Sequence, residues 1–381
     1  MIIHIKHSKN NSSTPFVVFV MFCFLVQLPV NLLIAEEKTH FRVTTVVQGL
    51  THPWSMAFLP DDRILITERP GHLRLIEKGR LHPQAISGLP GIAAEGQGGL
   101  LDIVLHPDYQ KNGWIYFSYS AEDENGIGTE VARARLKGMK LTHLQIIFRV
   151  EEKSEGGRHF GARLVFDTKG YLYISVGERG DRPRAQDIDD HAGSIIRLHD
   201  DGRVPKDNAF VGKPDAKPEI YSYGHRNPQG MTLHPTTGEV WTHEHGPQGG
   251  DEINIIQSGK NYGWPVITYG VNYGWGTKIG EGTHKPGMEQ PLYYWDPSIA
   301  PSGMSFYNGN KFPQWRGDLF VGSLKFNLLV RLKLKNNKVV KEERLLANKY
   351  GRIRDVRNGP GGYLYLLTDD SNGSLLRLEP R

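Results

Sequence analysis

The chain of 381 residues has a single cysteine, Cys23, and therefore none after residue 35. A disulfide framework is excluded, so the fold needs a self-sufficient hydrophobic core, which a chain of this length can supply. Charge of one sign does not accumulate either, because the formal net charge is +5 and no basic block exceeds a few residues. This pattern does not indicate a nucleic-acid-binding surface.

Two structural patterns are also scarce. Helical periodicity is almost absent after residue 35, and no glycine-rich loop follows a strand and opens a helix, as nicotinamide binding in a Rossmann fold requires. Glycine and proline are instead plentiful, with 44 and 23 residues, and aromatic residues make up 10%. This composition is typical of a globular protein rich in strands and turns.

The N-terminus has the features of a secretory signal. Lys6 and Lys9 precede an apolar run over residues 16–35, and a polar segment follows it. A basic start, an apolar middle and a small residue before a polar segment are typical of such signals. We therefore predict a signal peptide over residues 1–35, a mature domain over residues 36–381, and a periplasmic or secreted location.

An uncleaved N-terminal anchor is the alternative for this segment. Its end, Leu33-Ile34-Ala35, matches the small-x-small cleavage rule poorly. Pro29 and Asn31 within the run disfavour a stable membrane-spanning helix. We expect no stable membrane embedding of the mature domain.

One pattern then recurs six times: a short apolar strand, a turn with Pro, Asp or Gly, and a second strand rich in Tyr, Ile, Leu and Val. The first strands are predicted at residues 54–58, 101–105, 162–166, 230–233, 303–307 and 353–356. Six such units predict an all-β fold, a six-bladed β-propeller. A β-sandwich or two all-β domains is the alternative, but no linker-like stretch divides the chain. Residues 43–47 are expected to close the ring by pairing with residues 374–378.

Unusual polar residues stand at or just before the first strand of several repeats. They are Gln97, His159, Arg226, Asn227, Arg352 and Arg354. The innermost strand of each blade lines the propeller axis, so residues at equivalent points converge at one end of the channel. Each residue alone has an ordinary reading as part of a turn, a loop or a solvated strand. Their common phase in the repeats favours a functional site.

The segment 243–254, HEHGPQGGDEIN, is a candidate metal loop. His243 and His245 suggest zinc or copper, but no third nitrogen or sulfur ligand stands at a familiar spacing. Backbone carbonyls exposed by glycine and proline, together with the carboxylates of Asp251 and Glu252, are hard oxygen donors that favour calcium. An ion-free Asp/Gly-rich turn is the alternative.

Four runs of sequence together resemble a known family. They are Gly96–Leu101, Arg158–Gly161, Gly224–Gly230 and Glu244–Asn254. Their ordered series is similar to that of the soluble aldose sugar dehydrogenases of the soluble glucose dehydrogenase family, which use pyrroloquinoline quinone (PQQ). The likeness spans residues 43–378. It implies PQQ- and calcium-dependent oxidation of aldose sugars at C1 to lactones, with hydride transfer from C1 of the sugar to C5 of the quinone.

The resemblance also implies roles for individual residues. His159 matches the general base for the anomeric hydroxyl, and Arg226 matches the cation beside the reacting quinone carbonyl. The positions that match cofactor contacts are Gln97, Asn227, Tyr273, Lys325, Arg352 and Arg354. The positions that match calcium ligands are Gly246 and Pro247 for a catalytic ion, and Glu252 and Tyr262 for a structural ion. A cationic channel mouth suits a quinone with three carboxylates.

One departure concerns the substrate. The residue before the predicted base is Arg158, where glucose-specialised members carry an acidic residue, so the resemblance favours broad use of aldoses. The expected partners are the sugar and an electron acceptor that the sequence does not identify, in a monomer or a homodimer. Two other functions fit a propeller: a non-enzymatic extracellular binding module and a calcium-dependent lactonase.

Overall fold

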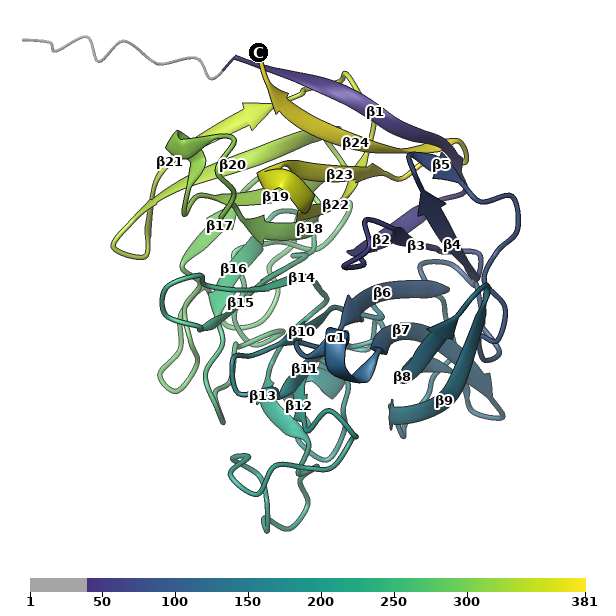
Figure 1. The fold of residues 1–381 in the computed structure, drawn as a ribbon. Helices are drawn as coiled ribbons and strands as arrows, with labels where there is room; N and C mark the ends of the chain where they lie inside the picture. The colour runs from purple at the N-terminus through teal and green to yellow at the C-terminus, as the bar shows by residue number, and fades with distance from the viewer. Residues whose placement is uncertain (1–39) are drawn as a thin grey trace, which may run out of the picture. The chain divides into compact units, whose positions relative to one another are not determined.

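The computed structural model describes residues 40–381, so the predicted signal segment lies outside the described residues. These residues form six four-stranded antiparallel sheets that follow one another around a ring (Figure 1). The prediction of an all-β, six-bladed propeller is confirmed. Short helices occur only in connections of the described part: α1 (Tyr109–Asn112), η1 (Arg182–Gln186), η2 (Pro313–Trp315) and η3 (Pro360–Gly362).

The sheets are numbered as blades in chain order. Blade 1 contains β2 (Pro53–Phe58), β3 (Ile64–Glu68), β4 (His72–Glu77) and β5 (Arg80–Leu81). Blade 2 contains β6 (Leu100–Leu105), β7 (Trp114–Asp123), β8 (Gly126–Lys137) and β9 (Lys140–Arg149). Blade 3 contains β10 (Leu164–Phe166), β11 (Leu172–Val176), β12 (Ser194–Leu198) and β13 (Ile220–Tyr223).

The remaining blades complete the ring. Blade 4 contains β14 (Pro228–Leu233), β15 (Val240–Glu244), β16 (Asp251–Ile255) and β17 (Tyr293–Trp295). Blade 5 contains β18 (Pro301–Phe306), β19 (Leu319–Ser323), β20 (Leu328–Lys335) and β21 (Lys338–Leu345). Blade 6 contains β22 (Ile353–Asn358), β23 (Leu364–Thr368), β24 (Gly373–Pro380) and β1 (Phe41–Leu50).

The first strand of every blade lies at the axis. Each of the strands β2, β6, β10, β14, β18 and β22 contacts the first strand of the next blade, and β22 contacts β2. These inner strands are buried almost throughout, whereas the outermost strand β21 is largely exposed or half-buried. This gradient explains why the inner strands read as short apolar runs without polar alternation.

Apolar clusters fill the space between each pair of neighbouring blades. Leu65 of blade 1 packs in one cluster with Ile103 of blade 2, and Ile195 of blade 3 packs in another with Met231 of blade 4. Corresponding clusters join blades 2 and 3, 4 and 5, 5 and 6, and 6 and 1. A blade buries both faces only against its neighbours, so the core is continuous around the ring.

The ring closes as predicted, because the N-terminal strand β1 pairs with the C-terminal strand β24. Val43 lies opposite Leu378, and Val47 lies opposite Leu375. One strand from each end of the domain therefore completes blade 6 (Figure 1).

The predicted first strands agree with the observed ones to within two residues at each end, and one of the differences concerns the site. Strand β10 begins at Leu164 rather than at residue 162. Gly161 and Ala162 both have left-handed backbone, with φ of 65° and 78°, so the extended conformation of β10 starts only after them.

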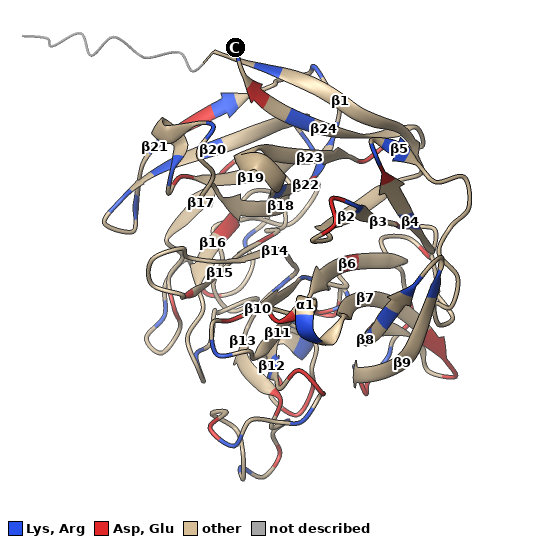
Figure 2. Cartoon of the chain, viewed as in Figure 1, with Lys and Arg blue, Asp and Glu red and all other residues tan. Residues whose placement is uncertain are grey.

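Lys, Arg, Asp and Glu residues are interspersed around the ring (Figure 2).

Candidate active site at one end of the channel

A cavity of about 280 Å³ lies where the inner strands begin. Its walls come from blades 1, 2, 4, 5 and 6, and they are formed by Trp54, Arg69, Gly96, Gln97, Asn227, Gln229, His245, Ala300, Leu324, Arg352, Arg354 and Asp369. Four of the predicted site residues, Gln97, Asn227, Arg352 and Arg354, are therefore brought together. Three arginines and one aspartate give the walls a positive balance, which suits an anionic ligand.

His159 stands next to this cavity and is held from two sides. Its backbone N–H donates to Oε1 of Gln97 at 2.8 Å, and its Nδ1 lies 2.6 Å from Oε2 of Glu178. A carboxylate accepts hydrogen bonds, so Nδ1 carries the proton and Nε2 keeps its lone pair. The residue has left-handed backbone with φ of 54°, a conformation that is uncommon outside glycine and that the Gln97 contact supports.

The imidazole of His159 is neutral near pH 7. Burial lowers its pKa below the ordinary value of 6.5, and this outweighs the neighbouring carboxylate of Glu178, which raises it. The side chain is 11% exposed, which leaves it access to a bound substrate. A buried, oriented and unprotonated imidazole is a general base ready to accept a proton.

A pH profile follows from this shift. The reaction needs neutral His159, so kcat/KM should fall as the pH drops through its folded pKa, which places the acidic limb below pH 6.5. In Glu178→Gln the charge that raises this pKa is gone, and the limb should move to still lower pH. Profiles measured over about pH 4–9 with saturating cofactor test both statements. An acidic limb centred above pH 6.5 in the unmodified protein would contradict the assignment.

Arg226 does not line the cavity of about 280 Å³, but it lines a second, smaller cavity that shares His245 with it. Its Nη1 donates to the backbone oxygens of His245 and Gly246 at 3.1 and 2.9 Å, and its backbone N–H donates to Glu244 at 2.5 Å. Among the described residues, its buried Nε has no hydrogen-bond partner. The Nε–H of Arg226 is thus available to donate a hydrogen bond to a ligand bound next to it.

Arg352 and Arg354 share one carboxylate, that of Asp369. Oδ2 of Asp369 accepts from Nη2 of Arg352 at 3.0 Å and from Nη2 of Arg354 at 2.8 Å. Burial would raise the pKa of Asp369, but the two guanidinium groups hold it well below its ordinary value. The buried Nε of Arg354 has no partner among residues 40–381. Asp369 therefore fixes both cations while leaving a donor unsatisfied in the wall.

Two predicted cofactor contacts do not lie in the cavity wall. Lys325 is exposed after β19, with its ammonium 5.3 Å from the ring centre of Phe326, although its neighbour Leu324 lines the cavity. Tyr273 is 66% exposed on the loop over residues 271–278, next to Trp275, which is 96% exposed. The roles of Lys325 and Tyr273 in holding a cofactor stay predictions.

A second, much smaller cavity of about 10 Å³ adjoins the first, and His245 lines both. Its walls include the predicted metal positions Gly246, Glu252 and Tyr262, together with Glu244. Glu244 and Glu252 lie directly opposite each other on β15 and β16. Burial and the charge of Glu244 raise the pKa of Glu252 well above its ordinary value. A void of this size, next to the buried carboxylate of Glu244 and the half-buried one of Glu252, suits a single small cation.

The loop between β15 and β16 is tightly folded around these oxygens. A side chain at Gly246 would overlap the carbonyl oxygens of Gly249 and Gly250, so only glycine fits there. Pro247 is buried and does not line the small cavity. The carboxylate of Asp251 braces the loop instead of facing an ion. It accepts from the backbone N–H groups of Gly246, Ile299 and Ala300 and from the hydroxyl of Ser298.

A zinc- or copper-type site at His243 and His245 has no support from the geometry. Within residues 40–381, no group of three or more His, Cys, Asp or Glu side chains is placed to hold a metal. Nε2 of His245 lies 2.5 Å from the carbonyl oxygen of Pro301, to which it donates. The donors gathered near the small cavity are oxygens, as calcium prefers.

Sequence reasoning missed residues that follow the second strand in four of the blades. Arg69, Glu178, Leu324 and Asp369 stand one or two positions after β3, β11, β19 and β23, and His245, which was predicted only as a candidate metal ligand, stands at the same place after β15. The first two strands of a blade are antiparallel, so the end of the second lies beside the start of the first. The repeat phase that indicated Gln97 could therefore have indicated these residues too.

Comparison with known proteins identifies the family. The sequence model of the Glucose / Sorbosone dehydrogenase family matches residues 50–377. The chain belongs to this family. It is 50% identical over 346 residues to an aldose sugar dehydrogenase of Escherichia coli (strain K12), which covers 89% of this chain and 93% of that protein. Like its relatives in the family, the protein is an oxidoreductase.

Solved structures of family members have the same fold as this chain. The apo form of the soluble aldose sugar dehydrogenase from Escherichia coli has a TM-score of 0.87 at 48% identity, over 90% of this chain and all of that one (100%). The PQQ-bound aldose sugar dehydrogenase from Streptomyces coelicolor has a TM-score of 0.74 at 28% identity, over 90% of this chain and 99% of that one. No helix within residues 40–381 is long and apolar enough to cross a membrane.

Proposed function

We propose that this family member oxidises aldose sugars at C1 to lactones, with PQQ and calcium as cofactors. The observation that carries the proposal is the pairing of a neutral, oriented imidazole at His159 with a cation-rich cavity next to it. Removing two electrons from the sugar requires a base for the hydroxyl proton and an acceptor for hydride from C1. His159 supplies the first, and the cavity is suited to hold the second.

The residues present fit PQQ. The cofactor is planar and carries three carboxylates, and the cavity offers Arg69, Arg352 and Arg354 as counter-charges. The unpartnered Nε donors of Arg226 and Arg354 match a ligand rich in acceptor oxygens. A solved relative is described as PQQ-bound. When bound, the quinone supplies the two-electron acceptor for the hydride.

The chain's own groups then have separate tasks. Glu178 fixes the ring of His159 so that Nε2 can take the anomeric hydroxyl proton. Gln97 holds the backbone of His159, and its exposed side chain lines the cavity beside it. Arg226 places positive charge near the site, where it would stabilise negative charge that develops on an acceptor oxygen.

The proposal includes a structural calcium ion at the small cavity, with Glu252 and the backbone oxygen of Tyr262 as donors and Gly246 in the wall. Two facing carboxylates repel each other in a buried site unless a cation or a proton stands between them. The carbonyl of Gly246 already accepts from Arg226, and its second lone pair remains for an ion. Gly246 and Pro247 stay predicted ligands of a separate, catalytic calcium ion through their backbone oxygens.

Reconstitution tests the proposed function. Protein purified without cofactors and treated with a chelator should not reduce an artificial electron-accepting dye. Addition of PQQ and calcium together should produce sugar-dependent dye reduction with a range of mono- and disaccharide aldoses. Full activity without quinone would contradict the cofactor assignment, and activity on glucose alone would contradict the broad substrate range.

Calcium binding has its own readout in thermal stability. A ligand that binds only the folded protein at about 100 times its Kd adds about 2.7 kcal/mol to the free energy of unfolding, so calcium should raise Tm by several degrees. Glu252→Gln should remove most of this gain, because one of the two facing carboxylates is lost. Glu239→Gln, in an exposed turn, is the matched control and should keep it. An unchanged calcium response in Glu252→Gln would place the ion elsewhere.

The location remains a proposal as well. The features of residues 1–35 support export to the periplasm or the exterior, where an aldose and an external acceptor would meet the enzyme. Detection of the protein in the cytoplasmic fraction alone would contradict it.

A further inference from the structure

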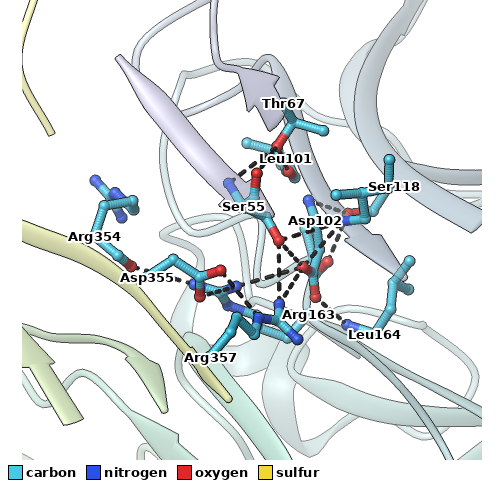
Figure 3. A network of polar contacts seen from close by, with 12 residues as sticks. Ser55, Thr67, Leu101, Asp102, Ser118, Arg163, Leu164, Arg354, Asp355 and Arg357 are labelled. Carbon is cyan, nitrogen blue, oxygen red and sulfur yellow. Dashed lines mark hydrogen bonds and ion pairs between the residues drawn. The ribbon is translucent and has the colours of Figure 1, made fainter. Parts of the chain in front are cut away.

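Four charged side chains, from the inner strands β6 and β22 and from the residue just before β10, meet in one network of polar contacts (Figure 3). Arg163 forms ion pairs with Asp355 at 2.8 Å and with Asp102 at 3.4 Å. Arg357 forms ion pairs with Asp102 at 2.6 Å and with Asp355 at 3.0 Å. Two guanidinium groups and two carboxylates balance, so this cluster, which we call the channel cluster, is electrically neutral.

Arg163 is the member that reaches the cavity. Its Nε donates to the carbonyl oxygen of Gln229 at 2.7 Å, and its Nη2 donates to the carbonyl oxygen of Arg354 at 3.4 Å. Its guanidinium carbon lies 4.1 Å from the ring centre of Trp54. Trp54, Gln229 and Arg354 all line the large cavity, and they come from blades 1, 4 and 6. One buried cation thus contacts cavity-lining residues from three blades.

We propose that Arg163 is a positioning residue for the cofactor. It holds Trp54, Gln229 and Arg354 in place, and it keeps the floor of an anion-binding cavity neutral. The inference rests on the proposed function, because it concerns the site for the quinone. The side chain is only 2% exposed, so it acts through these neighbours and not by direct contact with a bound ligand.

Loss of Arg163 has two physical consequences. Asp102 and Asp355 would share the single cation Arg357, which leaves one net negative charge under a cavity that must accept carboxylates. The carbonyl groups of Gln229 and Arg354 would also lose their common donor, so the wall could shift. Both consequences weaken binding of an anionic ligand. A residue that only plugs the channel would instead lower stability and leave binding unchanged.

The experiment compares the affinity for PQQ and the thermal stability in a small set of variants. Arg163→Met should raise the Kd for PQQ, followed by absorbance titration, by about 10- to 100-fold. Adding Asp355→Asn to Arg163→Met restores the charge balance, so the double variant should regain most of the affinity. Arg163→Lys keeps the charge but cannot make all three wall contacts, and its Kd should be intermediate.

Arg331→Met is the matched control. Arg331 is also a buried arginine between two carboxylates, with Asp318 at 2.6 Å and Glu343 at 2.9 Å, and none of these three lines the cavity. This variant should lower Tm and leave the Kd for PQQ unchanged.

The outcomes separate the two proposals. If Arg163→Met lowers Tm as Arg331→Met does but binds PQQ with the affinity of the unmodified protein, Arg163 is a channel plug and the inference is wrong. If Arg163→Met does not fold, an unchanged Kd in Arg163→Lys overturns the inference equally. Unmodified protein that binds no PQQ would overturn the proposed function itself, and this inference with it.

Discussion

His159→Ala is expected to lower kcat about 100- to 10,000-fold while the Kd for PQQ stays close to that of the unmodified protein, because removal of a general base typically costs this much in rate. The side chain accepts the hydroxyl proton of the sugar and does not line the cavity proposed for the cofactor. Chemistry and cofactor binding should therefore separate in this variant. Titration of PQQ at saturating aldose, with dye reduction as the readout, gives both quantities.

Two further variants sharpen this test. His159→Gln keeps a polar side chain that can still hydrogen-bond Glu178 but has no basic nitrogen, so it should be as slow as the alanine variant. His191 is also a buried histidine next to a glutamate, with Nε2 3.6 Å from Glu219, and it lies outside the cavity. His191→Ala should keep normal turnover. Near-normal turnover of His159→Ala at saturating PQQ would make His159 a structural loop residue.

The propeller could be predicted because each blade repeats one local pattern. Short apolar strands such as Trp54–Phe58 reflect burial on both faces, and turns such as that at Pro60-Asp61-Asp62 separate the strands. Phase within the repeat was also sufficient to place Gln97, Asn227, Arg352 and Arg354 in one cavity wall. Both inferences need only the rule that equivalent positions of a cyclic repeat meet at the axis.

What the sequence did not reveal depends on pairs that are remote along the chain. Glu178 acquires its role because its carboxylate meets Nδ1 of His159, and Asp369 because it meets two arginines. The left-handed backbone at Ala162, which shortens β10, could not be predicted either, because alanine normally avoids this conformation. Arg163 looked like one more strand residue, and only the closed ring brings it between Asp102 and Asp355.

The structure also changes which cationic residue is expected to contribute most to binding of the cofactor. The family resemblance treats Lys325 and Arg354 alike, as groups that hold the quinone. In the structure Arg354 is 8% exposed and lines the cavity, whereas Lys325 is exposed and lies over Phe326. A charge contact in a buried wall contributes more than one in water, because solvent and salt screen the exposed group.

Arg354→Met should consequently raise the Kd for PQQ far more than Lys325→Met. Truncating one partner of a buried, hydrogen-bonded charge pair costs about 2–5 kcal/mol, which corresponds to roughly 30- to 5,000-fold in Kd. Part of this loss arises because Asp369 keeps its negative charge in the wall, with Arg352 and Nδ1 of His52 as its remaining side-chain partners. Arg354→Met combined with Asp369→Asn should therefore bind PQQ more tightly than Arg354→Met alone, although less tightly than the unmodified protein.

Once PQQ saturates Arg354→Met or Lys325→Met, kcat should recover most of its value, because His159 is intact. If Lys325→Met proved the more damaging of the two, the ammonium would have to turn into the cavity when the cofactor binds, and the quinone would lie nearer blade 5 than the present wall suggests.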